Sequence, residues 1–489
     1  MADITPSNKE LEVKLLCDRS IVPNSPNDTE IHLMCQITAP EDDMIRAPVS
    51  ICAVIDRSSS MKDNMELMRM TLKFMVDQFR AEDRLALVMF DHDVSVEFEL
   101  TAMNEGGKEK ARKIIESICE RGHTNLSGGL LAGLNVFYQV PEELATKVES
   151  VLLFTDGRAN YGITNPRTLE KAARNTVMQI SRNTNIFTFG YGTEHDANIL
   201  RTIAEAGNGL FYFIESQESI PESFCDCLGG LLSVAAQNLI LSLTAECQVV
   251  LQKPSTPFPV TVVKPGKEIQ IKVPDIYSGE AKCVVVPTLL SGTRNPVQEE
   301  VLLAKLNVTG FSVCSSSHVS LDSQVSVFVD PNCKIAVNSK DQGDILVNRM
   351  RIATSEVLEE GKQLSEKGEI AEARQLITDL IQTISHSEVG KHEVCLYCIE
   401  SLNEVLVELK DKITYKAKAN KLMNQFAQGH AWQRANVSKP TMLQQHIADN
   451  VCATDSKEEK LKQAEVTPFF ANPYQNKKKG AMKMGYFLK

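Results

Sequence analysis

The chain has 489 residues, of which 43% are hydrophobic and 24% are charged, and its formal net charge is −11. This length exceeds what one hydrophobic core usually supports, so about two to four globular domains are expected. The acidic balance argues against general nucleic-acid binding, and no apolar run approaches the roughly 20 residues that a membrane span needs.

Residues 10–38 alternate apolar and polar side chains, which is typical of β-strands with one buried face. A polar turn at 24–28 separates two such runs. Two strands are too few to form a stable sheet in water. We therefore expect the N-terminal segment, residues 1–46, to pair with strands from elsewhere in the chain.

Residues 47–236 combine short apolar runs with helical stretches. Runs of this length are typical of strands that are buried on both faces of a parallel sheet. Residues 94–100 alternate instead, as expected of an antiparallel edge strand. The pattern predicts a doubly wound α/β domain that closes with a helix at 219–236. The apolar runs lie at 49–55, 85–90, 151–154, 186–191 and 210–214.

Residues 237–335 return to the alternating pattern, with Gly and Pro clusters between the runs. Because the N-terminal strands need partners, we infer one antiparallel β-sandwich built from residues 1–46 and 237–335. The α/β domain would then be inserted between the second and third strands of this sandwich.

A helical pattern covers residues 340–428. It predicts three helices with short connections, which is typical of a small α-helical bundle. The turn between the first two helices is expected at Lys367–Glu369. Residues 429–489 lose the pattern, and a mostly disordered tail is predicted there. A short docking motif built on the aromatic residues of the tail is the alternative.

Oxygen-bearing side chains lie on three predicted loops near strand ends. In open parallel sheets, ligands bind outside the carboxyl ends of the strands. Carboxylate and hydroxyl oxygens suit a hard divalent ion, so Mg²⁺ or Mn²⁺ is predicted. The candidate ligands are Asp56, Ser58 and Ser60 after the first strand, Thr124 on a second loop, and Asp156 after a third strand.

This order of residues, D-x-S-x-S followed by Thr and then T-D-G, resembles the metal-ion-dependent adhesion site of the von Willebrand factor type A domain. Each of the five family positions is matched, and Ser59 stands where the family often has Gly. The resemblance implies that Ser58, Ser60 and Thr124 bind the ion directly. It also implies that Asp56 and Asp156 often act through water.

A site with few direct anionic ligands leaves the ion short of negative charge, with an octahedral position open. A carboxylate from another protein is the natural ligand for that position. We therefore expect a protein partner that presents Asp or Glu. The expected function is a cation-dependent scaffold or adaptor without enzymatic activity, without nucleic acid as a partner and without a membrane span of its own.

The predicted layout also resembles intracellular proteins in which a von Willebrand type A domain is flanked by β segments and followed by helices. Some plant members carry a RING zinc module and act as ubiquitin ligases. This chain lacks the clustered Cys and His ligands of such a module. Because of the resemblance, one alternative function is that of a component of a ubiquitin-system assembly that has no RING module of its own.

A metal-dependent hydrolase or phosphatase that uses the same acids is the other alternative. The aspartyl-phosphate class needs a second Asp two residues after the first, and Ser58 stands there. His123 adjoins Thr124 and is interpreted as a solvated neighbour rather than a catalytic base. Asp91–Asp93 is interpreted as a polar turn between two strands.

His392, Cys395 and Cys398 share one helical face and form half of a possible zinc site. Leu396 and Ile399 continue the apolar pattern, so an ordinary helix core is the favoured interpretation. The thirteen cysteines are an odd number scattered through apolar patterns, as is typical of reduced thiols. With an N-terminus that has no signal-peptide pattern, they predict a cytoplasmic protein.

Overall fold

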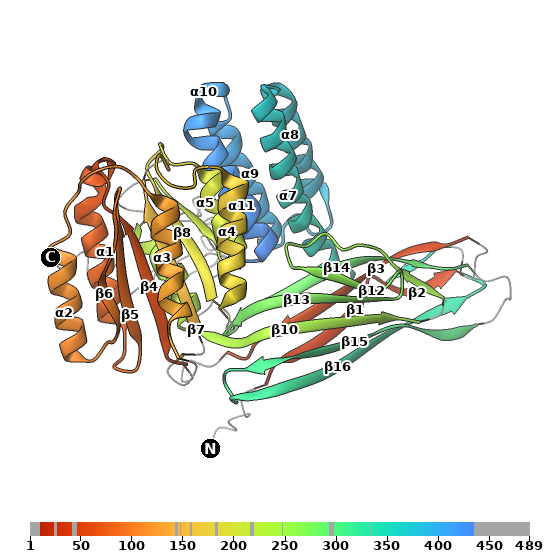
Figure 1. The fold of residues 1–489 in the computed structure, drawn as a ribbon. Helices are drawn as coiled ribbons and strands as arrows, with labels where there is room; N and C mark the ends of the chain where they lie inside the picture. The colour runs from red at the N-terminus through yellow and green to blue at the C-terminus, as the bar shows by residue number, and fades with distance from the viewer. Residues whose placement is uncertain are drawn as a thin grey trace, which may run out of the picture.

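The computed structural model describes residues 10–434 apart from short internal segments. Most of the predicted tail, residues 435–489, lies outside the described residues. Figure 1 shows an α/β domain with helices on both faces of its sheet, a group of long strands, and a set of C-terminal helices that packs against both. The internal segments not described are 24–26, 42–45, 142–144, 147, 157–158, 181–183, 216–219, 247, 293–297 and 334.

A six-stranded sheet in the order β6-β5-β4-β7-β8-β9 forms the centre of the α/β domain. Only β6 runs antiparallel, against β5, among the pairs of this sheet. The predicted buried strands and the predicted edge strand are confirmed. The strands are β4 (Val49–Asp56), β5 (Arg84–Phe90), β6 (Val94–Ala102), β7 (Val148–Thr155), β8 (Thr184–Tyr191) and β9 (Phe211–Ile214).

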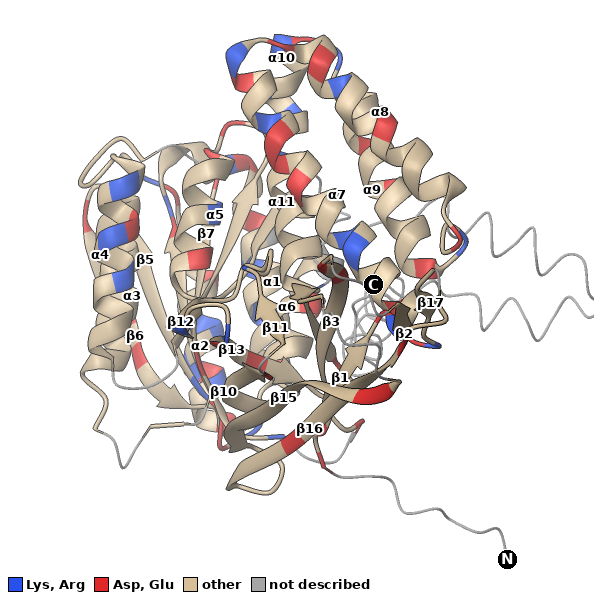
Figure 2. Cartoon of the chain, turned by 90° about the vertical axis from the view of Figure 1, so that its right-hand side faces the viewer, with Lys and Arg blue, Asp and Glu red and all other residues tan. Residues whose placement is uncertain are grey.

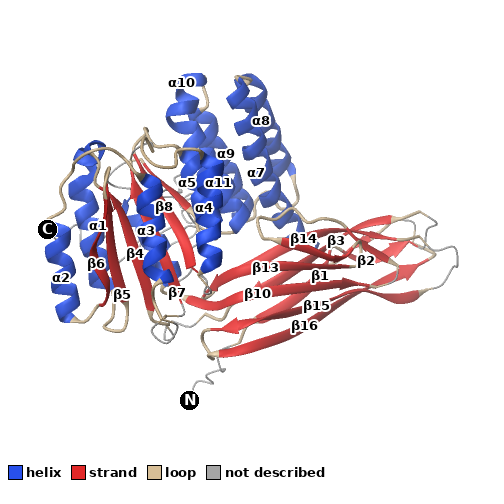
Figure 3. Ribbon diagram, in the orientation of Figure 1, coloured by secondary structure: helices blue, strands red, loops and turns tan. Residues whose placement is uncertain are grey.

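Helices cover both faces of this sheet, as Figure 3 shows. Alternate residues of β4 point to opposite faces. Ile51 and Ile55 belong to the core with α1 and α6, whereas Val54 belongs to the core with α3 and α5. The helices are α1 (Met65–Gln78), α2 (Glu105–Glu116), α3 (Leu126–Tyr138), α4 (Pro166–Gln179), α5 (Ala197–Ala206) and α6 (Ile220–Leu231).

The last helix of the domain is shorter than predicted. Helix α6 ends at Leu231 rather than at residue 236, and β10 (Val234–Ala245) follows almost at once. Two consecutive glycines, Gly229 and Gly230, lower helix stability near this end. The alternating apolar and polar residues of β10 begin directly afterwards, so the α/β domain is connected to the next sheet without a long linker.

The remaining strands form a four-stranded sheet, β1-β3-β14-β11, and a seven-stranded sheet, β12-β13-β10-β15-β16-β2-β17. Both sheets combine N-terminal strands with strands that follow the α/β domain. The strands are β1 (Glu12–Cys17), β2 (Arg19–Pro23), β3 (Thr29–Thr38), β11 (Val249–Leu251), β12 (Val260–Lys264), β13 (Glu268–Tyr277), β14 (Ala281–Leu290), β15 (Glu299–Ser312), β16 (Ser317–Asp330) and β17 (Val337–Asn338).

Two details of the predicted β region are wrong. The N-terminal segment has three strands, so the α/β domain follows the third strand rather than the second. Strand β2 also pairs with β16 in parallel. The chain bends at Asp18, whose carboxylate accepts a hydrogen bond from the His32 N–H of β3 at 2.9 Å, and continues as β2 beside β16; this partner is distant in sequence, so the sequence pattern did not reveal the strand. A two-layer sandwich remains a prediction.

The C-terminal helices form a bundle that extends beyond its predicted end. Gly368 closes the first helix with a φ of 94°, which confirms the predicted turn. The bundle was expected to end at residue 428, but α11 continues to Trp432 and Arg434 is still buried. The helices are α7 (Gln342–Lys367), α8 (Ile370–His386), α9 (Glu393–Glu408), α10 (Lys412–Thr414), the π-helical turn η4 (Tyr415–Ala419) and α11 (Asn420–Trp432).

Polar contacts explain why α11 is buried although its sequence is not apolar. The side-chain oxygens of Gln425 and Gln428 accept hydrogen bonds from the N–H groups of Phe213 and Phe211, both at 2.7 Å. Strand β9 is an edge strand, so these amides replace a neighbouring strand. Gln433 bonds both backbone groups of Cys283 on β14. Helix α11 and the residue that follows it therefore join the α/β domain to the four-stranded sheet.

Figure 2 shows acidic and basic residues interspersed along the C-terminal helices. Among the helices that the structure describes, none is both long enough and apolar enough to cross a membrane.

We predict that a fragment of residues 238–330 does not fold without residues 1–46. Strand β3 pairs with β14 over the whole length from Thr29↔Leu290 to Thr38↔Ala281, so its removal exposes a strand edge and buried apolar residues. Circular dichroism and urea unfolding of the fragment should show no cooperative transition, and mixing with a 1–46 peptide should increase its solubility. A soluble fragment that unfolds cooperatively alone would contradict the shared β region.

Candidate cation site

The first part of the candidate site is the end of β4. Asp56 is the last residue of this strand and is completely buried. One carboxylate oxygen accepts a hydrogen bond from the Ser58 N–H at 2.8 Å, and the other accepts from the Thr155 hydroxyl at 2.5 Å. Because Thr155 ends β7, this carboxylate ties together the carboxyl ends of two neighbouring parallel strands.

Ser58, Ser60 and Asp156 continue this arrangement. The Ser58 and Ser60 hydroxyls lie 3.1 Å apart, and the Ser60 hydroxyl donates to Asp156 at 2.8 Å. The second oxygen of Asp156 accepts from the amide of Asn64 at 3.2 Å. The structure thus brings four of the predicted ligand residues into one connected group at the switch point between β4 and β7.

Thr124 is buried on a separate loop, which leads into α3. Its backbone N–H donates to the side chain of Asn160 at 2.9 Å, and its carbonyl oxygen accepts from the N–H of Tyr161 at 3.3 Å. The loop is held against the β4 end because the Gly122 carbonyl accepts from the Ser59 N–H at 3.3 Å. The Thr124 position is therefore fixed next to the serine loop by backbone contacts.

The two acids of the site are buried with neutral partners. In the described part of the chain, neither Asp56 nor Asp156 forms an ion pair with Lys, Arg or His, and their hydrogen bonds come from hydroxyl, amide and backbone groups. Burial raises the pKa of Asp56 to about 6 and also raises the pKa of Asp156. A divalent cation would offset the cost of burying these carboxylates.

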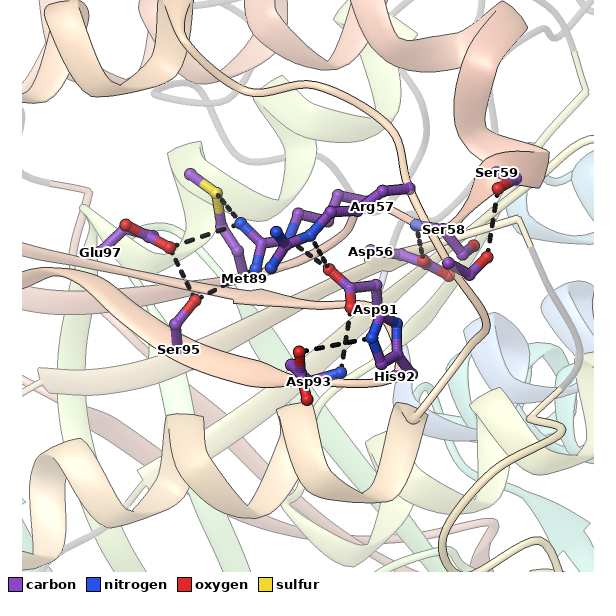
Figure 4. Close-up of polar contacts among 12 residues, drawn as sticks. Asp56, Arg57, Ser58, Ser59, Met89, Asp91, His92, Asp93, Ser95 and Glu97 are labelled. Carbon is purple, nitrogen blue, oxygen red and sulfur yellow. Dashed lines mark hydrogen bonds and ion pairs between the residues drawn. The ribbon is translucent and has the colours of Figure 1, made fainter.

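A second polar group lies beside the site, at the end of β5 (Figure 4). Asp91 is completely buried and accepts hydrogen bonds from Arg57 at 2.7 Å and from Arg121 at 2.8 Å. Burial would raise its pKa, but hydrogen bonds from the Asp93 N–H and the two guanidinium groups lower it to about 2. Asp91 is thus an ionised partner of two arginines, and more than the polar turn that was predicted.

Asp91, His92 and Asp93 are also close enough together to bind a metal, since one ligand atom of each lies within 4.8 Å of the others. We assign no cation to this group, because the two guanidinium groups already neutralise Asp91. Sequence reasoning missed the role of Asp91. Its position directly after a buried strand, at the same sheet edge as Asp56, was the available signal.

The other sequence motifs do not form a metal centre in the residues that the structure describes. His392 caps the N-terminus of α9, where its ring nitrogen accepts from the Val394 N–H at 3.2 Å. Cys398 is buried in the helix core, 3.9 Å from a ring nitrogen of His430. His123 is exposed, as expected of a solvated neighbour.

Residues 50–224 match the sequence model of the von Willebrand factor type A domain. Beyond this domain, most of the chain is similar in fold to a von Willebrand factor type A protein from Catenulispora acidiphila, with a TM-score of 0.60, 13% identity and coverage of 89% of this chain and 99% of that one. It is also similar to the ArnB paralog VWA2 from Sulfolobus acidocaldarius, with a TM-score of 0.55, 15% identity and coverage of 88% and 100%. At these identities the likeness concerns the fold alone.

Two relatives show how far the sequence similarity extends. The uncharacterized protein sll0103 of Synechocystis sp. is 24% identical over 281 residues, which cover 56% of this chain and 64% of that protein. The human inter-alpha-trypsin inhibitor heavy chain H3 is 29% identical over 168 residues, 33% of this chain and 18% of that protein. The chain therefore spans less than two thirds of these relatives.

The buried carboxyl of Asp56 predicts a pH dependence of stability in the presence of a chelator. A carboxyl whose pKa is higher in the folded than in the unfolded state stabilises the fold below the unfolded value, near 4. That contribution is lost as the pH rises through about 6. Over this range, wild type should lose about 3 kcal/mol of unfolding free energy relative to Asp56→Asn.

Urea unfolding of both proteins between pH 4 and 7 measures this difference. Parallel pH profiles for wild type and Asp56→Asn would show that Asp56 titrates normally, and the argument from its burial would be wrong.

Proposed function

Residues 50–224 form a von Willebrand factor type A domain, and we propose that the chain is a cytoplasmic scaffold or adaptor that binds a protein partner through a divalent cation. The observation that carries this proposal is the pair of buried carboxylates, Asp56 and Asp156, whose hydrogen-bond partners are neutral. We propose Mg²⁺ or Mn²⁺ as the ion, held by Asp56, Ser58, Ser60, Thr124 and Asp156.

The charge of this ligand set supports a binding role. Two carboxylates balance a divalent ion formally, but Asp56 already accepts hydrogen bonds from Thr155 and Ser58. The ion would depend mainly on neutral hydroxyl oxygens and keep a position for an external anion. A carboxylate of a partner fits that position, because it would place a charged oxygen in direct contact with an ion whose other direct ligands are mainly neutral.

The solvent exposure of residues around the site supports the same role. Ser60 is exposed although Ser58 and Asp156 are buried, so the group opens to solvent on the side of the serine loop. Exposed residues on the neighbouring loops, such as His123 and Tyr161, lie where a bound partner would meet the domain. These loops would read the shape of the partner around its carboxylate.

We predict that saturating Mg²⁺ or Mn²⁺ raises the melting temperature and that Asp56→Ala abolishes the increase. A ligand at ten times its dissociation constant stabilises the folded state by about 1.4 kcal/mol. Asp93→Ala is the matched control, because Asp93 is an exposed acid on the adjacent loop. Equal melting curves with and without the ions in wild type would count against a functional cation site.

We also predict that chelation and Thr124→Ala each release the principal protein partner without unfolding the domain. Thr124→Ala removes one proposed ligand and keeps both acids, so the loss should appear in partner binding more than in stability. Affinity capture from lysate, with and without a chelator, measures the first effect, and titration of the purified partner onto the variant measures the second. A partner retained under both conditions would instead bind through the β-sheets or helices.

A further inference from the structure

Arg57 lies in the sequence between two proposed ligands, Asp56 and Ser58. A guanidinium group beside a divalent cation would weaken its binding by Coulomb repulsion. In the structure this side chain is buried and extends away from Asp56 and Ser58 (Figure 4). Its nitrogens contact Asp91 at 2.7 Å and Glu97 at 3.4 Å, so the positive charge is neutralised away from the site.

Asp91 connects both ligand-bearing loops from one position at the end of β5. The same carboxylate oxygen that accepts from Arg57 also accepts from Nε of Arg121, at 2.8 Å. Its backbone carbonyl accepts from the Asn125 N–H at 2.7 Å. Arg57 belongs to the serine loop, and Arg121 and Asn125 flank Thr124.

Two backbone hydrogen bonds place the same segments in register. The Arg57 N–H donates to the Phe90 carbonyl at 2.9 Å, and the Arg121 N–H donates to the Arg57 carbonyl at 2.6 Å. Backbone contacts alone therefore bring together Phe90, Arg57 and the loop that carries Thr124. The buried carboxylate of Asp91 adds two charge-assisted hydrogen bonds, which are the strong contacts in this group.

We propose that Asp91 is a positioning residue of the cation site. It holds the Arg57 guanidinium away from the ion and fixes the serine loop relative to the Thr124 loop. This inference rests on the proposed function. Residues that orient metal ligands without touching the metal change metal affinity by about 10- to 100-fold when they are substituted.

The test is isothermal titration of Mn²⁺ into the full chain and its variants. Asp91→Asn should weaken Mn²⁺ binding by about 10- to 100-fold. Arg121→Gln should weaken it in the same direction but less, and this half-exposed side chain can be replaced without opening the core. Arg112→Gln is the matched control, because Arg112 forms an exposed ion pair with Asp77 in the same domain. Its affinity should equal that of wild type.

A rescue experiment separates positioning from a general loss of structure. In the Asp91→Asn background, Arg57→Gln removes the guanidinium that has lost its partner, and part of the Mn²⁺ affinity should return. A purely structural role of Asp91 predicts no such recovery. A double variant that binds Mn²⁺ no better than Asp91→Asn would therefore overturn the repulsion argument.

The outcomes also distinguish this inference from the function on which it rests. Wild-type binding of Mn²⁺ with unchanged affinity in both Asp91→Asn and Arg121→Gln overturns the positioning role and leaves the cation site intact. A wild-type protein that binds no Mn²⁺ overturns the proposed function itself, and the positioning role with it.

Discussion

Two buried carboxylates with neutral partners, Asp56 and Asp156, determine what the edge of the parallel sheet can do. Burial of an unpaired carboxylate is costly, and a protein usually compensates with a cation or with protonation. Here the strand order places β4 beside β7, so the acids at the carboxyl ends of these strands lie at one edge. The serine hydroxyls between them supply further oxygen ligands but no positive charge. The edge is therefore suited to a cation from solution.

The basic residue inside this motif would oppose a cation if it were free to approach. Arg57 follows Asp56 directly, yet its guanidinium lies against Asp91 and Glu97. Asp91 in turn is shared with Arg121, so this neighbouring group is close to electrically neutral. Two acids at this edge of the sheet therefore differ in their ionisation and in their partners. Asp91 is ionised and paired with arginines, whereas Asp56 has a raised pKa and, among the residues that the structure describes, no arginine partner.

The features predicted well from the sequence are those carried by local patterns. The runs at 49–55 and 151–154 are two buried strands, and Asp56 and Asp156 at their ends belong to one hydrogen-bonded group with Ser58 and Ser60. Long-range contacts explain what was missed. Strand β2 begins after a bend at Asp18 and pairs with β16 and β17, which come after the α/β domain in the chain. A tail is predicted from residue 429 because the residues there show no apolar pattern, but their partners lie in distant parts of the chain, as Gln433 shows by bonding both backbone groups of Cys283 on β14.

A crystal of the full chain soaked in Mn²⁺ tests the central claim most directly, because anomalous diffraction locates the ion without reference to activity. We predict an anomalous peak among the side-chain oxygens of Ser58, Ser60 and Thr124, with Asp56 and Asp156 around it. The peak should disappear in an Asp56→Ala crystal soaked in the same way. A peak at Asp91–Asp93 alone, or no peak at this edge of the sheet, would contradict a cation site built from these residues.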